Sequence, residues 1–284
     1  MSTTTDLARL LGMGRLTHVV DIGANPIDGA PPYRPLLDAQ LCRLTGFEPQ
    51  ASALAELNLK KGANEAYFPY AVGDGKEHTL NLCAYSGWTS MFVPSAAALE
   101  VFSFFKNNAR VVGQTRIQTH RLDDLSEVTD IDFLKMDIQG GELGVLMHGR
   151  EKLKNAAVIQ VEVQFVDLYE GQPTLGQVDQ EMRAQGFIPH AFAGLKKWPI
   201  SPLQLGGDPT RPLNQVLEAD LVYVCDFVHP DGISDDRLKH LCLIAHSCYD
   251  SFDLAGRCIA VLEQRKAIPT GALQGYIDIL QSAS

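Results

Sequence analysis

Short apolar runs and amphipathic stretches follow one another along most of the chain. Runs rich in β-branched residues that stop at turn residues predict buried strands, and apolar residues recurring every three or four positions predict helices. Strands that alternate with helices are typical of an α/β protein with a mostly parallel sheet. We expect strands at 18–22, 41–47, 66–72, 78–83, 116–122, 132–137, 157–163, from 186 onward, and at 217–224.

The helical pattern predicts a lead-in helix, helices between the strands, and a helical region after the last strand. From Ser234 onward, apolar residues recur at helical spacing and predict about two helices. We therefore expect a main domain over residues 1–228, with its lead-in helix within 1–15, and a C-terminal helical extension over 229–284. The helices expected between the strands are 34–44, 51–60, 143–155 with Leu143, Leu146 and Met147 facing the core, and 176–185.

The segment after residue 65 predicts a β-hairpin. The expected strand 66–72 runs into Gly73-Asp74-Gly75, a turn sequence, and the expected strand 78–83 follows it. Asp74 is either a plain turn residue or, at the tip of a strand, a neighbour of a bound adenine ring, and turn chemistry alone favours the first. The small polar loop 86–91 is interpreted as a flap beside an active site.

The first predicted strand ends abruptly in Gly23, Ala24 and Asn25. A turn of small residues at the carboxyl end of a strand lets a ligand approach the main chain closely, where open α/β sheets bind their ligands. Taken alone, this stretch slightly favours an ordinary strand-to-loop turn, since a single turn that contains glycine is weak evidence. The second strand favours a ligand-binding turn, because Glu48 follows Asp21 by 27 residues and ends that strand.

A carboxylate at the tip of the second strand accepts hydrogen bonds from both hydroxyls of a ribose. The spacing from the glycine turn to Glu48 is close to the interval that a βαβ unit imposes between such a turn and a ribose-binding acid. The alternative for Glu48 is a surface residue that caps a strand. With the glycine turn upstream, we favour a nucleoside-binding site.

The strand 132–137 repeats this architecture, because it delivers Asp137 to the turn Gly140-Gly141. Two acid-bearing strand ends are difficult to attribute to chance. Glu142 follows the turn, where an acid in the first turn of a helix is also favoured by the helix dipole alone. Glu162 lies near the carboxyl end of the strand 157–163, where a neighbouring strand alone can satisfy it.

Composition and charge exclude several classes of protein. The net charge of −10 disfavours nucleic acid, which normally binds a basic face. The first residues lack the basic region and the apolar core that are typical of a signal peptide. No apolar run approaches the roughly 18 residues of a membrane span, so we expect a cytoplasmic protein. The six cysteines are dispersed, which favours reduced thiols and no structural zinc.

Several motifs together resemble the FkbM family of S-adenosylmethionine-dependent methyltransferases, over about residues 16–225. The resemblance implies a Rossmann-like class I methyltransferase fold, with a seven-stranded, mostly parallel sheet and one antiparallel strand. It also implies methyl transfer, commonly to a hydroxyl oxygen of a sugar or natural product. The motifs are Asp21-Ile-Gly-Ala-Asn25, Gly46-Phe-Glu-Pro49, Ala71-Val-Gly-Asp74, Leu122-Asp-Asp-Leu125 and Phe133-Leu-Lys-Met-Asp-Ile-Gln-Gly-Gly-Glu142.

The resemblance also implies roles for single residues. Asp21, Gly23, Ala24 and Asn25 are expected to line the methionine part of the cofactor, Glu48 to bind its ribose and Asp74 to lie near its adenine. Asp137 and Glu142 are expected to face the region of methyl transfer. The chain departs from the family pattern at Gln139 and Gly141, where the family usually has Glu and Ala, and in the loop 26–28, which falls after the asparagine.

Three functions follow as hypotheses. The leading one is an S-adenosylmethionine-dependent methyltransferase that O-methylates a sugar, a glycan or a small metabolite, with Asp137 positioning the reactants, Glu142 or Glu162 as the base, and no metal. A nicotinamide-dependent oxidoreductase is weaker, because Asn25 and Pro26 stand where a dinucleotide fingerprint needs glycine. The third is a non-catalytic scaffold, against which the intact acids argue. A homodimer is left open.

Overall fold

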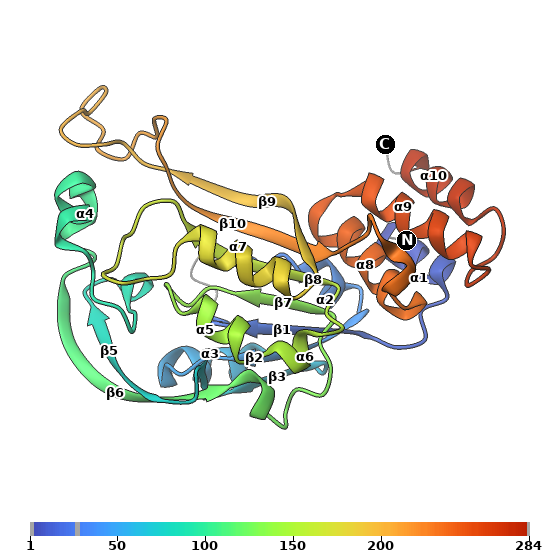
Figure 1. Cartoon of the computed structure of the whole chain (residues 1–284), viewed down its shortest axis with the longest axis horizontal. Helices are drawn as coiled ribbons and strands as arrows, with labels where there is room; N and C mark the ends of the chain where they lie inside the picture. Colours follow the sequence, from blue (N-terminus) through green and yellow to red (C-terminus); the bar gives the residue numbers. More distant parts are fainter. Residues whose placement is uncertain (1–2, 26–28, 283–284) are drawn as a thin grey trace.

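The protein is built on a seven-stranded sheet, and its computed structural model describes residues 3–25 and 29–282 (Figure 1). The strand order is β3-β2-β1-β7-β8-β10-β9, in which β10 alone runs antiparallel to its neighbours. This confirms the predicted fold class. The strands are β1 (Thr17–Ile22), β2 (Cys42–Phe47), β3 (Glu65–Phe68), β7 (Phe133–Met136), β8 (Val158–Gln164), β9 (Phe187–Lys197) and β10 (Val216–Cys225).

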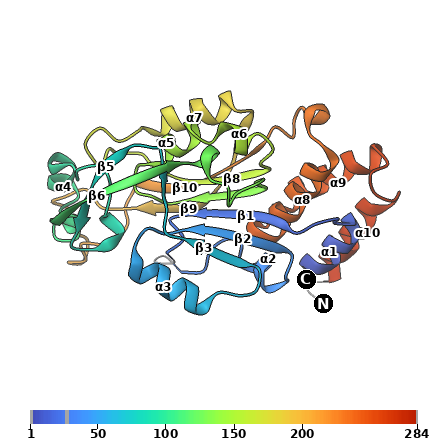
Figure 2. The ribbon, with the colours of Figure 1, turned by 90° about the horizontal axis from the view of Figure 1, so that it is seen from below.

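Helices cover both faces of the sheet, and Figure 2 shows α5, α6 and α7 on the side opposite α2 and α3. Alternate strand residues point to opposite faces, so Val20 packs under α5–α7 while Val19 packs with α2, α8 and α9. The sheet therefore has two apolar cores. The helices are α2 (Arg34–Asp38), α3 (Ala51–Lys60), α5 (Glu142–Met147), α6 (Arg150–Leu153), α7 (Leu175–Ala184), α8 (Asp235–Tyr249) and α9 (Phe252–Gln264).

Residues 226–282 contain three α-helices, where the pattern predicted about two, because α10 (Ala272–Ser282) follows α9. Figure 1 shows these helices gathered with α1 (Thr3–Leu11) at one end of the sheet. Leu11, Leu241, Ile259 and Tyr276 belong to the same apolar cluster as Val19 of the central strand. The helical extension thus shares a core with the sheet.

No helix of residues 3–25 and 29–282 is long and apolar enough to cross a membrane.

The predicted strand 66–72 is wrong as a single element. β3 ends at Phe68, and β4 (Ala71–Gly73) begins a second sheet of order β4-β6-β5. Pro69 separates the two strands, because it has no N–H to donate to a ladder. The predicted hairpin is wrong for a related reason: β5 (Glu77–Cys83) pairs antiparallel with β6 (Val111–Arg121), and β4 pairs with β6 as well.

Two predicted helices are shorter than expected. The helix predicted at 34–44 ends at Asp38, and Gln40 adopts a positive φ of 56° before β2 begins. The helix predicted at 143–155 is divided into α5 and α6 at His148 and Gly149. Leu146 is buried as predicted, but Met147 is 50% exposed and does not face the core.

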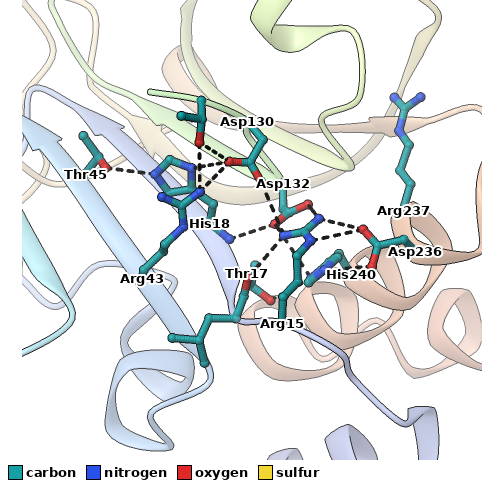
Figure 3. Close-up of polar contacts among 12 residues, drawn as sticks. Arg15, Thr17, His18, Arg43, Thr45, Asp130, Asp132, Asp236, Arg237 and His240 are labelled. Atoms are coloured by element: carbon teal, nitrogen blue, oxygen red, sulfur yellow. Dashed lines mark hydrogen bonds and ion pairs between the residues drawn. The ribbon is translucent and has the colours of Figure 1, made fainter. Parts of the chain in front are cut away.

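A polar cluster ties the amino ends of the strands to α8 (Figure 3). The guanidinium of Arg15 donates two hydrogen bonds to buried Asp132, at 2.6 and 2.7 Å, and reaches Asp236 of α8 at 2.7 Å. Asp132 also accepts the backbone N–H of His18 at 2.8 Å. The cluster lies at the end of the sheet opposite the carboxyl ends of β1 and β7, so it joins the extension to the sheet away from the predicted site.

Candidate active site

A cavity of about 1360 Å³ opens at the carboxyl ends of the central strands. Residues of both sheets line it, together with the loop 86–91 that the sequence predicts as a flap. Its volume exceeds the roughly 300–1,000 Å³ of pockets that hold one small ligand. The cavity therefore has room for a cofactor and an acceptor together.

The glycine turn after β1 packs directly against the end of β7. Gly23 has a φ of +81°, and a Cβ built on it would lie 2.1 Å from the carbonyl oxygen of Asp137. The N–H groups of Gly23 and Ala24 both donate to the carbonyl oxygen of Phe47, at 3.0 and 3.1 Å. Gly23, Ala24 and Asn25 line the cavity, and the N–H groups of Gly23 and Ala24 are engaged by β2. Their contact with a cofactor stays a prediction.

Asp21 lies on the cavity wall with 2% of its surface exposed. The hydroxyl of Tyr33 donates to its Oδ2 at 2.6 Å, and the ammonium of Lys135 lies 3.5 Å from its Oδ1. Oδ1 has no hydrogen-bond partner among the described residues. Burial raises the pKa of Asp21, although Lys135 and Tyr33 oppose this. Oδ1 is thus held by its ion pair with Lys135 and retains the capacity to accept a hydrogen bond from a ligand.

Glu48 lies at the tip of β2 and lines the cavity, as the spacing predicts. Its Oε1 accepts the backbone N–H of Gln50 at 2.7 Å, so this oxygen also stabilises the turn into α3. Burial raises the pKa of Glu48, while hydrogen bonds from the backbone at Gln50 and Asn25 act in the opposite direction. Both interpretations of Glu48, as a turn acceptor and as a ligand acceptor, are compatible with this position.

Asp74 does not lie among the residues that line the cavity. It accepts hydrogen bonds from Lys76, His78 and Thr119, which close the turn between β4 and β5. Although partial burial opposes ionisation, these hydrogen bonds lower the pKa of Asp74 to about 2. The structure thus does not bring Asp74 together with Asp21 and Glu48.

Gln139 connects the acids around the end of β7. Its amide donates to Oδ1 of Asp137 at 3.1 Å and to Oε2 of Glu162 at 3.0 Å. Its Oε1 accepts the hydroxyl of Tyr169, and its carbonyl oxygen accepts the hydroxyl of Ser90 in the predicted flap. The two hydrogens of the Gln139 amide allow it to donate to both carboxylates at once, which an ionised carboxylate at this position could not do.

The three predicted catalytic acids are placed differently. Asp137 lines the cavity, whereas Glu142 and Glu162 are buried behind its wall. Glu142 accepts the N–H of Ile138 at 3.0 Å, and Glu162 accepts hydrogen bonds from Gln139 and Gln164. Burial raises the pKa of Glu162, and the negative charge of Asp137 raises it further. Their placement gives Glu142 and Glu162 no direct access to a ligand in the cavity.

Glu142 makes the stability of the protein depend on pH. Burial raises its pKa from 4.5 to about 7, although backbone hydrogen bonds act against the change. Because the folded state holds this proton more tightly, the contribution of Glu142 is fully present below pH 4.5 and is lost as the pH rises to 7 and above. The difference corresponds to about 3 kcal/mol. We expect Glu142→Gln to flatten the fall in unfolding free energy between pH 4.5 and 7.5, measured by urea denaturation, and an unchanged slope would contradict this.

Sequence reasoning missed several residues that line the cavity. Lys135 precedes Asp137 by two residues on β7, so its side chain shares a face with it. Although burial alone lowers it, the pKa of Lys135 is raised by Asp21, Asp137 and Asp220. Polar residues within an apolar strand were the available signal. The missed residues are Tyr33, Lys135, Gln139, Gln160, Lys196, Glu218 and Asp220.

Comparisons with known proteins agree with this geometry. A model of the Methyltransferase FkbM domain matches residues 21–189. The 2-O-methyltransferase NoeI of Sinorhizobium fredii (strain NBRC 101917 / NGR234) is 41% identical over 66 residues, which are 22% of this chain and 27% of that protein. The match therefore spans about a quarter of that relative's length.

Solved structures with a related arrangement include one methyltransferase and one further protein, both in complex with S-adenosylmethionine. Magnesium protoporphyrin IX methyltransferase (ChlM) from Synechocystis PCC 6803 with bound SAM is 11% identical, with a TM-score of 0.39 over 79% of this chain and 78% of that one. M. jannaschii TYW2 in complex with AdoMet is 15% identical, with a TM-score of 0.35 over 79% and 76%. Both the sequence identities and the TM-scores are low.

The strand order, its single antiparallel strand and the cavity at the strand ends define a protein with the class I methyltransferase fold. The chain belongs to the FkbM methyltransferase family, whose domain model covers more than half of it. The oxidoreductase and scaffold alternatives gain no support from the family match.

Proposed function

We propose that the protein is an S-adenosylmethionine-dependent O-methyltransferase that acts on a hydroxyl of a sugar, a glycan or a small metabolite. The observation that carries the proposal is the meeting of Asp21, Gly23 and Glu48 on one wall of a cavity large enough for two ligands. The name of the relative NoeI, a 2-O-methyltransferase, supports a hydroxyl oxygen as the acceptor atom.

The residues on this wall fit the chemical groups of the cofactor. Asp21 offers a carboxylate oxygen that is ion-paired with Lys135 but accepts no hydrogen bond from the described residues, and Gly23 keeps side-chain atoms away from the turn. Glu48 offers carboxylate oxygens to the two hydroxyls of a ribose. S-adenosylmethionine supplies an electrophilic methyl group, so the protein mainly has to hold an acceptor oxygen in line with it and to exclude water. Of the three predicted catalytic acids, we assign Asp137 to positioning in the cavity.

The first test is ligand binding. We expect S-adenosylhomocysteine to raise the midpoint of thermal unfolding, because a ligand that binds only the folded state stabilises it by mass action. NADH at the same concentration should leave the midpoint unchanged. A shift with NADH and none with S-adenosylhomocysteine would favour the oxidoreductase instead.

Glu48→Ala is expected to weaken the binding of S-adenosylhomocysteine by about tenfold to a hundredfold. Loss of a charge-assisted contact to a ribose costs about 1.5–3 kcal/mol. Isothermal titration calorimetry measures the change, with Glu56→Ala as the control. Glu56 is a largely exposed acid of α3 that forms a surface ion pair with Lys60. An unchanged dissociation constant for Glu48→Ala would reduce Glu48 to a residue that shapes the turn.

A further inference from the structure

One face of the sheet changes from apolar to polar along the strands. Near the amino ends of the parallel strands, Phe133 and Val158 pack with α8 and α9, and Val222 of antiparallel β10 joins the same core. Two residues further towards the cavity, the same face presents Lys135, Gln160 and Asp220. Residues two apart point to the same side of a strand. The face is therefore apolar where the helices cover it and polar where the cavity exposes it.

The strand register makes these polar residues one continuous surface. Lys135 pairs with Gln160 across β7 and β8, while Asp220 of β10 pairs with Glu162 of β8 and with Gly194 of β9. One step further along the same face, Glu218 pairs with Lys196. Residues opposite one another share a face. We call Lys135, Gln160, Lys196, Glu218 and Asp220 the polar floor of the cavity.

The contacts within the polar floor hold its groups in fixed positions. The hydroxyl of Tyr249, at the end of α8, donates to Oε1 of Gln160 at 2.8 Å. Lys196 lies 2.9 Å from Glu218. A Cβ on Gly194 would lie 2.9 Å from Oδ2 of Asp220, so the glycine leaves the space that this carboxylate occupies. The side chains of the polar floor are therefore held in place by neighbouring protein groups and do not extend freely into solvent.

The charge of the cavity restricts what the floor can bind. Six carboxylates and three cations line the described cavity, which leaves an excess of negative charge: Asp21, Glu48, Asp137, Glu218, Asp220 and Asp250 against Arg116, Lys135 and Lys196. S-adenosylmethionine carries only one net positive charge, so the cavity remains negative when it is bound. An anionic acceptor meets like charge there, whereas a neutral one does not.

The mixture of groups also favours a particular chemistry. Carboxylates accept, ammonium groups donate and an amide does both, which matches neighbouring hydroxyls that are each donor and acceptor. Phe105 and Trp198 line the same cavity with ring centroids 4.5 Å apart and offer apolar surface to the C–H faces of a sugar ring. Lys196, Glu218 and Asp220 lie beyond the residues 21–189 that the family model matches.

We propose that the polar floor is the acceptor subsite, and that it takes an uncharged sugar with Asp220 accepting a hydrogen bond from a sugar hydroxyl. The inference rests on the proposed methyltransferase function. It adds where the acceptor lies and which charge it carries. Sugars that bear a carboxylate or phosphate are excluded.

Saturation-transfer-difference NMR on the full chain saturated with S-adenosylhomocysteine tests the proposal. The probes are the methyl glycosides of glucose, galactose and mannose and, for each, the matched uronic acid glycoside. We expect at least one neutral glycoside to bind and its uronic acid partner to bind at least about tenfold more weakly. Binding of the acid as tight as that of the neutral sugar, or binding by none of the neutral glycosides, overturns the inference.

Calorimetry with S-adenosylhomocysteine separates this result from the proposed function. Failure to bind S-adenosylhomocysteine refutes the proposed cofactor. Normal binding of S-adenosylhomocysteine without discrimination between the sugars refutes only the acceptor subsite. The two proposals therefore fail in distinguishable ways.

Two variants address Asp220 itself. Asp220→Asn should weaken the neutral glycoside about tenfold and reduce its advantage over the uronic acid, since one negative charge is removed. Gly194→Ala keeps the charge but displaces the carboxylate, so the neutral glycoside should bind more weakly while the acid stays excluded. Asp278→Asn, in an exposed residue of α10, is the control. Unchanged glycoside binding in both Asp220→Asn and Gly194→Ala overturns the role of Asp220.

Discussion

Replacing Gly23 by alanine is expected to abolish measurable binding of S-adenosylhomocysteine and to destabilise the fold by more than about 3 kcal/mol. The new Cβ would lie 2.1 Å from the carbonyl oxygen of Asp137 and 3.1 Å from its carbonyl carbon. These are backbone atoms of the neighbouring strand, so no side-chain rotation relieves the clash. The end of β1 or β7 must move, and both ends form the wall of the cavity. Calorimetry and urea denaturation measure the two effects.

Gly186→Ala is a matched control for the strain in Gly23→Ala. Gly186 has a φ of +83°, almost equal to the +81° of Gly23, and a Cβ on it meets nothing within 4 Å. This variant should lose only the about 1–2 kcal/mol that a left-handed residue costs without glycine. It should bind S-adenosylhomocysteine normally. Equal destabilisation of the two variants would show that backbone conformation, and not the approach to β7, explains Gly23.

The residues at the ends of clearly patterned strands were the part of the candidate site that the sequence could predict. Asp21, Gly23 and Glu48 stand at the ends of strands that the apolar pattern defines clearly, and parallel strands bring such ends to one edge of a sheet. Asp74 follows a strand by the same local pattern. The break at Pro69 sends its strand into another sheet, and pairing partners are not visible in local alternation.

The acceptor side of the cavity was less predictable, for a different reason. Glu142 and Glu162 are polar residues near strand ends, as Asp137 is, but the wall that buries them forms only when Gln139 and the flap are in place. Asp220 follows Asp137 by 83 residues, and the reversed direction of β10 places it opposite Glu162, on the same cavity as Asp137. Alternation predicts that a strand has a polar face, but not which half of that face a helix covers.

The polar cluster that joins the sheet to the C-terminal helices was even less predictable from the sequence. Arg15 meets Asp132 across 117 residues and Asp236 across 221 residues. An arginine between the lead-in helix and the first strand looks like a loop residue, since charged residues are common there. Only the packing of α8 beside the amino ends of the strands brings the three charges together (Figure 3).

Asp132→Ala is expected to lower the free energy of unfolding by about 3 kcal/mol. Breaking a buried ion pair typically costs about 3–5 kcal/mol, and the lower figure applies because the side chain of Arg15 is 37% exposed and keeps Asp236. The backbone N–H of His18 also loses its acceptor within the sheet. Urea denaturation with a common slope for both proteins gives the difference.

Asp236→Ala removes a more exposed carboxylate from the same guanidinium and serves as the comparison. The side chain of Asp236 is 55% exposed, whereas that of Asp132 is 4% exposed, so its loss should cost less than about 1 kcal/mol. Because this cluster lies at the opposite end of the strands from the cavity, both variants should bind S-adenosylhomocysteine with unchanged affinity under native conditions. Equal costs for the two substitutions would mean that burial does not set the strength of this tie, and weakened ligand binding in Asp132→Ala would mean that the two ends of the sheet are coupled.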